Sequence, residues 1–167
     1  ARETGDSAAM AVLSGTEIVY VARASVRTLV RMEAHVGSHF PAHATSMGRV
    51  LLAGRTSEQL ADYFGKAKLE KLTEKTVTDR AELEKLIASC RREGYAVVEE
   101  ELALGVVALA VPVHDASGRV VAALNSSSHS RHTSGAVLVG QRLPTLLRIA
   151  KAISAELASV PVLSLSA

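Results

Sequence analysis

The uninterrupted apolar run VVALAVPV, residues 106–113, restricts the possible folds more than any other segment of the chain. A strand with one exposed face alternates apolar and polar side chains, and this run does not, so both of its faces must be covered. Residues 115–118 have the composition of a turn, and residues 119–126 are typical of a strand that returns beside the first. The pattern predicts a strand that is buried on both faces.

The remaining segments predict further strands and helices. Residues 8–13 and 17–22 surround a turn at Gly15 and predict a hairpin, residues 28–33 and 95–100 predict two more strands, and residues 126–134 predict a polar loop. Helices are expected over residues 45–53, 56–65, 79–93 and 135–159, the last one bent at Pro144. This order of strands, helices, strands and helix predicts an α+β domain with a central, largely antiparallel sheet flanked by helices.

The helix expected over residues 79–93 has the clearest boundaries. Asp79 should cap its start, with Glu82 able to reach back to the Asp79 amide, and Gly94 should end it. Cys90 falls on the same face as Ile87, at the spacing of a buried helix face. This placement favours a buried small apolar side chain at Cys90 over a reactive thiol.

Composition and charge exclude several classes of protein. The chain carries 19 basic and 17 acidic side chains, which is too balanced for the basic face that a DNA-binding domain needs. A single cysteine allows no intramolecular disulfide, and no apolar run approaches the ~20 residues that would span a membrane. The N-terminus has no apolar signal-peptide core, so we expect a cytoplasmic protein.

Signatures of catalysis are weak. The chain has no Walker-type loop, and the segment TSMG at 45–48 lacks the first glycine of a nucleophile elbow. A dispersed Ser–His–acid site stays an alternative, with Ser46 as its nucleophile. His35, His39 and His43 are spaced four apart, but Gly37 and Pro41 interrupt the helix that would align them. We therefore expect polar loop residues there, and a zinc site stays the alternative.

Three acidic residues follow one another at Glu99, Glu100 and Glu101. Successive strand residues point to opposite faces, so only Glu99 and Glu101 could act together. We expect a solvated strand end, with one member turned toward a pocket.

Three segments together resemble the C-terminal effector-binding domain of IclR-type bacterial transcription regulators. They are VGSHFPAHATSMGRVLLA at 36–53, REGYAVVEEELALGVVALAVPV at 92–113 and DASGRVVAALNSS at 115–127. The resemblance implies a GAF-like or profilin-like sensor domain over residues 7–160. Residues 1–6 would end a linker helix, residues 161–167 would form a tail, and the family's N-terminal winged helix-turn-helix would be absent from this chain.

The resemblance also implies a ligand cavity between the inner sheet and the helix that starts near Thr45. Free amides at such a helix start suit a carboxylate. An anionic ligand would also favour a nearby cation, for which Arg23, Arg27, Arg31 and Arg49 are candidates, although most should be solvated. The implied ligand-binding residues are Ser46 and Met47 in the amide-bearing loop, Met32, Phe40, Val106 and Ala108 in the apolar wall, Asn125 and Ser127 at the far end, and Val98 at the rim.

The function that the resemblance implies is the sensing of a small organic acid, either an aromatic acid or a ring-cleavage product. The domain would not be an enzyme, and it would need no cofactor, metal or membrane. It would form a homodimer or homotetramer and reach DNA only through the absent N-terminal domain. Two alternatives stay open: a small hydrolase or isomerase that uses Ser46 and a histidine, and a GAF-type assembly module without a ligand.

Overall fold

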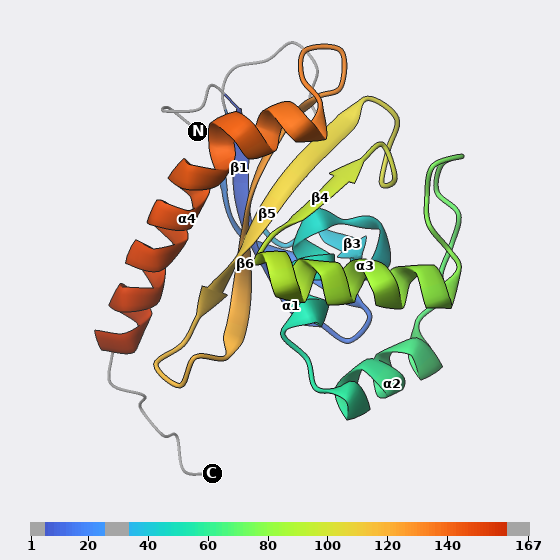
Figure 1. The fold of residues 1–167 in the computed structure, drawn as a ribbon, viewed down its shortest axis with the longest axis horizontal. Helices are drawn as coiled ribbons and strands as arrows, with labels where there is room; N and C mark the ends of the chain where they lie inside the picture. Colours follow the sequence, from blue (N-terminus) through green and yellow to red (C-terminus); the bar gives the residue numbers. More distant parts are fainter. Residues whose placement is uncertain (1–5, 26–33, 160–167) are drawn as a thin grey trace.

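A computed structural model describes residues 6–25 and 34–159 of the chain (Figure 1). Six strands form one antiparallel sheet in the order β3-β2-β1-β6-β5-β4. The strands are β1 (Ser7–Ser14), β2 (Glu17–Ala24), β3 (His39–Pro41), β4 (Ala96–Glu99), β5 (Val106–His114) and β6 (Val120–His129). The helices are the short 3₁₀ helix η1 (Ala42–Ala44), α1 (Ser46–Ala53), α2 (Ser57–Lys66), α3 (Arg80–Glu93) and α4 (Gly135–Ser159). The predicted α+β class and antiparallel sheet are confirmed.

Strand β5 is buried on both faces, as its apolar run predicts. Its odd-numbered residues Val107, Leu109, Val111 and Val113 pack in one apolar cluster with residues of α4. Ala110 belongs to a second cluster on the opposite face, beneath α1. Helix α3 packs on α1, so one face of the sheet carries α4 and the other carries α1 and α3 (Figure 1).

Several predicted boundaries are confirmed by their hydrogen bonds. The Asp79 carboxylate accepts from the Glu82 amide at 2.8 Å, and Gly94 ends α3 in the left-handed conformation at φ 77°. The side chain of Thr45 caps α1 by accepting from the Gly48 amide at 3.0 Å. Helix α4 contains Pro144, and Figure 1 shows the helix bending in its N-terminal part. No helix within the described ranges is long and apolar enough to cross a membrane.

Two predicted boundaries differ from the structure. Strand β6 continues to His129, where the sequence predicted a loop from Ser126 onward. The residues from Ser126 to His129 are polar, but they pair with residues Val106 to Leu109 of β5, and this pairing keeps them extended. The short strand β3 was not predicted, since three residues carry no periodic signal. The predicted strand at 28–33 and the predicted tail at 161–167 lie outside the described residues, as do residues 1–5 of the predicted linker-helix end.

Helix α1 lies close to the sheet because small residues meet at the contact. All eight of its residues are buried, and the sheet beneath contributes alanines at positions 9, 11, 96, 110 and 123 to the same cluster. Gly48 lies against the backbone of Ala42, so that a β-carbon at position 48 would overlap the Ala42 carbonyl oxygen. A larger side chain at position 48 would therefore push α1 and η1 apart.

A buried ion pair connects α1 to the turn that follows β4. The Arg49 guanidinium donates to the Glu101 carboxylate at 2.6 Å, and the two side chains are 4% and 9% exposed. The same carboxylate oxygen accepts from the Val77 amide at 3.0 Å, in the connector between α2 and α3. The contact corrects the expectation of a solvated Glu101 and shows that the candidate cation Arg49 is buried, whereas Arg27 and Arg31 lie outside the described residues.

Replacing Gly48 with Ala should lower the free energy of unfolding by about 3 kcal/mol, because the new methyl group meets backbone that can yield only by moving η1. Urea denaturation followed by circular dichroism measures the change. Gly65→Ala in α2 is the matched control, since its methyl group would have no atom within 4 Å. That control should leave stability unchanged or raise it by up to about 1 kcal/mol. Equal effects of the two substitutions would contradict the close approach of α1.

Arg49→Met and Glu101→Gln should each destabilise the fold by about 3–5 kcal/mol, because each leaves a buried polar partner uncompensated. The double variant should lose less than the sum of the two single losses, since the two residues act on one interaction. Lys85→Met is the control, because Lys85 pairs with Glu82 at 3.4 Å on the exposed side of α3 and should contribute under about 0.5 kcal/mol. Additive losses at positions 49 and 101 would argue against a shared interaction.

Candidate functional site

Most of the predicted ligand residues lie on one face of the sheet. Val98 pairs with Ala108, and Ala108 pairs with Ser127, so these three residues form a row across β4, β5 and β6. Asn125 lies in the next row, between Ala110 of β5 and Ala9 of β1. Side chains alternate along a strand, which puts all of them on the face that carries α1. Neighbouring Val106 pairs with His129 on the same face, one row beyond Ala108.

Asn125 is oriented by a backbone hydrogen bond. Its side-chain oxygen accepts from the Ala9 amide at 2.8 Å, and the residue is 4% exposed. An N–H can only donate, so this contact fixes the carboxamide with its oxygen toward β1. The NH₂ group then points away from that contact, and it makes no hydrogen bond to any described residue. Asn125 thus presents two donor hydrogens on a largely apolar face.

The start of α1 supplies backbone donors. Ser46 and Met47 are the first two residues of the helix and are 2% and 1% exposed. Their amides have no acceptor one turn earlier in a helix, and Thr45 caps only Gly48. Two contacts orient α1 along the sheet: Arg49 reaches the turn after β4, and Gly54 lies against Val120 at the opposite end. The helix start therefore faces the end of the sheet that carries Ser127 and Val98.

One predicted wall residue, Phe40, does not join this group. Phe40 lies in β3, the edge strand opposite β4, and contacts Tyr20 with the ring centres 5.3 Å apart. It packs against the cluster beneath α1, but four strands of the sheet lie between its strand and that of Val98. Met32 lies outside the described residues, so its predicted role is neither supported nor opposed.

A hydrogen-bonded turn borders the row at the end of β4. The Glu100 carboxylate accepts from Lys75 at 2.6 Å, from Ser130 at 2.7 Å and from the Gly105 amide at 2.9 Å. The hydrogen bond from Lys75, followed by that from Ser130, lowers the pKa of Glu100 to about 2. The Thr73 hydroxyl donates to the Glu100 carbonyl at 2.7 Å. The α2–α3 connector is thereby tied to the end of the sheet where the row lies.

The three spaced histidines have separate surroundings. His39 is exposed and lies 3.1 Å from the Glu17 carboxylate. His43 is buried in η1, with Nε2 3.0 Å from the Glu70 carbonyl oxygen, and His35 is exposed in the loop before β3. Residues 6–25 and 34–159 contain no group of three or more potential metal ligands in reach of one ion. His43 was expected in a polar loop and is instead part of the core.

Burial near α1 raises the pKa of two further side chains, Cys90 and Tyr63. Cys90 is 6% exposed, and burial raises the pKa of its thiol to about 12. Burial likewise raises the pKa of Tyr63 to about 12. The prediction that Cys90 is a buried small apolar residue is confirmed.

A nucleophilic site at Ser46 would need a base within hydrogen-bond reach. The Ser46 hydroxyl forms no hydrogen bond with a histidine or carboxylate of the described residues, and His43 directs Nε2 to the Glu70 carbonyl oxygen instead. What α1 and the sheet bring together is a set of hydrogen-bond donors on an apolar face. This arrangement suits the binding of an anionic or acceptor-rich molecule.

Sequence reasoning missed the two contacts that organise this face. Arg49 and Glu101 are 52 positions apart, and Asn125 and Ala9 are 116 apart. No local pattern relates such distant residues. The only available signal was a polar Asn125 inside an apolar strand, since a buried carboxamide must find a partner.

The chain is similar in sequence to curated bacterial regulatory proteins. In sequence, the chain is 42% identical over 143 residues to the Pca regulon regulatory protein of Pseudomonas putida, covering 85% of this chain and 49% of that protein. It thus spans about half the length of the curated relatives it matches.

Solved structures show the same fold. A putative transcriptional regulator from Rhodococcus superposes with a TM-score of 0.91 at 38% identity, covering 94% of this chain and 64% of that one. The inducer-binding domain of the Acinetobacter PobR transcription factor, a double mutant in complex with 3-hydroxybenzoic acid, superposes with a TM-score of 0.84 at 34% identity. That match covers 92% of this chain and 90% of the inducer-binding domain.

The model of the C-terminal domain of IclR-type bacterial transcriptional regulators matches residues 1–155. Because that match covers most of the chain, as the three sequence segments predict, the protein belongs to the IclR family of transcriptional regulators.

Proposed function

We propose that this domain binds a small aromatic carboxylic acid between the start of α1 and the sheet face around Asn125. The observation that carries the proposal is the orientation of Asn125, a residue 4% exposed whose oxygen is held by the Ala9 amide, which leaves its NH₂ group available as a donor. A hydrogen bond to such a donor contributes about 0.5–1.5 kcal/mol, so a ligand acceptor at this position would be favoured.

The two ends of the proposed ligand would meet different groups. The carboxylate is assigned to the amides of Ser46 and Met47, where the start of α1 favours negative charge. A hydroxyl or carbonyl oxygen at the other end is assigned to Asn125 and Ser127. Val98, Val106 and Ala108 would contact the ring, and Met32 and Phe40 stay proposed wall residues. The likeness to a domain solved with 3-hydroxybenzoic acid supports an aromatic acid of this size.

In the whole regulator, the ligand would change DNA binding through the N-terminal domain that the family implies. A ligand shifts such an equilibrium only by the difference of its affinity for two conformations, typically about 1–3 kcal/mol. Helix α1 could carry that difference, because Arg49 connects its first turns to Glu101 and to the α2–α3 connector. A dimeric or tetrameric assembly stays part of the proposal.

A thermal-shift assay with 3-hydroxybenzoate should raise the melting temperature of the chain. At 100 times its Kd a ligand stabilises by about 2.7 kcal/mol, a shift of several degrees for a domain of this size. The alcohol 3-hydroxybenzyl alcohol should give a much smaller shift, since it has no carboxylate for the amides of α1. Ser127→Val should abolish the shift, because the substitution removes a polar group from the ligand-facing row.

Ser128→Val is the matched control, because Ser128 is the next residue of β6 and points to the opposite face. It should retain the full shift with 3-hydroxybenzoate. Equal responses of the two variants would place the ligand elsewhere. Equal shifts with the acid and the alcohol would exclude the assigned role of the α1 amides.

A further inference from the structure

Strand β4 forms one edge of the sheet and pairs only with β5. The Glu100 amide donates to the Val106 carbonyl, so the backbone N–H of Glu100 points toward β5. Since this orientation alternates along a strand, Ala96 and Val98 also face β5, whereas Val97 and Glu99 face outward. A second hydrogen bond supports this assignment. The Ser130 amide donates to the Gly105 carbonyl, so the odd-numbered residues of β5 direct their backbone groups toward β6 and the even-numbered ones toward β4. The N–H and C=O groups of Val97 and Glu99 therefore have no strand partner.

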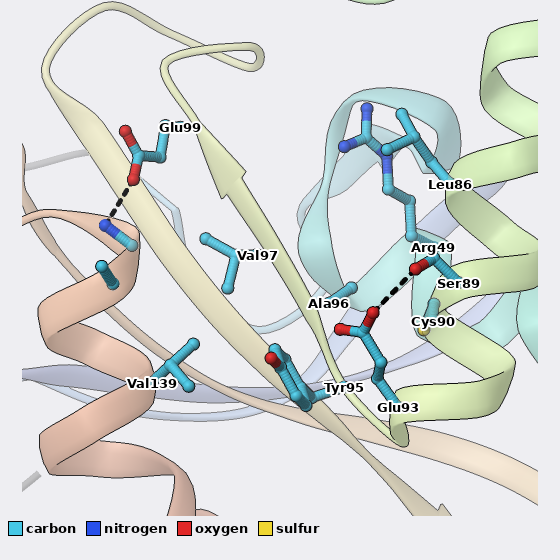
Figure 2. Close-up of a pocket in the computed structure, with 12 residues that line it drawn as sticks. Arg49, Leu86, Ser89, Cys90, Glu93, Tyr95, Ala96, Val97, Glu99 and Val139 are labelled. Atoms are coloured by element: carbon cyan, nitrogen blue, oxygen red, sulfur yellow. Dashed lines mark hydrogen bonds between the residues drawn. The ribbon is translucent and has the colours of Figure 1, made fainter.

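This edge lies at the base of a groove of about 310 Å³. One side of the groove is α3, with Leu86, Cys90 and Glu93, and the other is the start of α4, with Ala136 and Val139. Figure 2 shows the two helices on either side of β4, with the Glu99 side chain reaching across to the first amide of α4 at Gly135. The unpaired edge is thus recessed between two helices.

The recess determines what can pair with the edge. A further strand would lie about 4.8 Å from β4, within the space between the helices. Two copies of this chain would not pair β4 with β4, because each β4 is recessed in the same way. A single extended segment has no flanking helices and fits. Its side chains would alternate between the α3 side and the α4 side of the groove.

The charges of the groove define the chemistry of that segment. Glu93 contributes a carboxylate on the α3 side, whereas the Glu99 carboxylate is held by the first amide of α4 and the guanidinium of Arg49 is paired with Glu101 at 2.6 Å. The remaining surface includes the apolar side chains of Leu86, Val97 and Val139. A matching segment therefore alternates basic and apolar residues.

We propose that the groove along β4 binds an extended segment of a partner protein with alternating basic and apolar residues, which adds as a further strand to the sheet. The backbone groups of Val97 and Glu99 would supply the affinity, and Glu93 would select a basic side chain. This site is separate from the proposed ligand site, because it lies at the outer edge of β4 and not on the face beneath α1.

Selection of random nine-residue peptides displayed on phage against the full 167-residue chain tests the proposal. The expected result is enrichment of sequences with alternating Lys or Arg and apolar residues. Val97→Pro should weaken their binding at least tenfold, because it removes an outward N–H that a bound strand would use. A synthetic peptide of the enriched sequence should slow hydrogen exchange at the amides of Val97 and Glu99.

Two controls keep the outcome decisive. The Val97 amide has no partner within the sheet, so Val97→Pro should retain the wild-type circular dichroism spectrum. Should it fail to fold, Glu93→Lys on the exposed rim replaces it and should weaken basic peptides at least fivefold. The proposal is wrong if no sequence is enriched, if acidic sequences are, or if the peptides bind every variant equally. It is also wrong if Val97→Pro lowers the oligomeric mass of the chain, since a second copy would then occupy the edge.

Discussion

The close packing of α1 against an alanine-rich face of the sheet underlies both the stability and the chemistry of this domain. Small residues at positions 9, 11, 96, 110 and 123 let the helix approach, and Gly48 lets it lie against the backbone of Ala42. The approach buries all of α1 and brings its free amides toward the sheet. A polar helix start is thereby held over a largely apolar surface, an arrangement that favours a small anion.

Placing α1 in the interior also buries a charge. Arg49 lies in the same turn of the helix as the amide-bearing residues, and its pairing with Glu101 at 2.6 Å makes its burial tolerable. The ion pair connects α1 to the turn after β4. It also connects α1 to the α2–α3 connector, which is held by the hydrogen bond from Thr73 to Glu100. If ligand binding moved the start of α1, the turn after β4 and the α2–α3 connector would therefore move with it.

The two-sided burial of β5 has a further consequence for the edge of the sheet. Because α4 covers one face and α1 with α3 covers the other, the helices extend past β4 on both sides and leave its outer backbone groups in a groove (Figure 2). Exposed sheet edges invite pairing with other chains, and recession between helices restricts that pairing to thin, extended partners. The same layering thus shapes both the interior face proposed for the ligand and the outer groove.

The sequence by itself determined the class of fold, the helix boundaries at Asp79 and Gly94 and the family, because apolar periodicity, caps and local motifs depend on neighbouring residues. It also predicted Val98, Ala108, Asn125 and Ser127 as ligand residues, and the strand register places them side by side. Only the tertiary structure decided the orientation of Asn125, the burial of Arg49 and the extension of β6 through polar residues. Each of these depends on hydrogen bonds or ion pairs between residues far apart in the chain, and such contacts leave no local pattern to read.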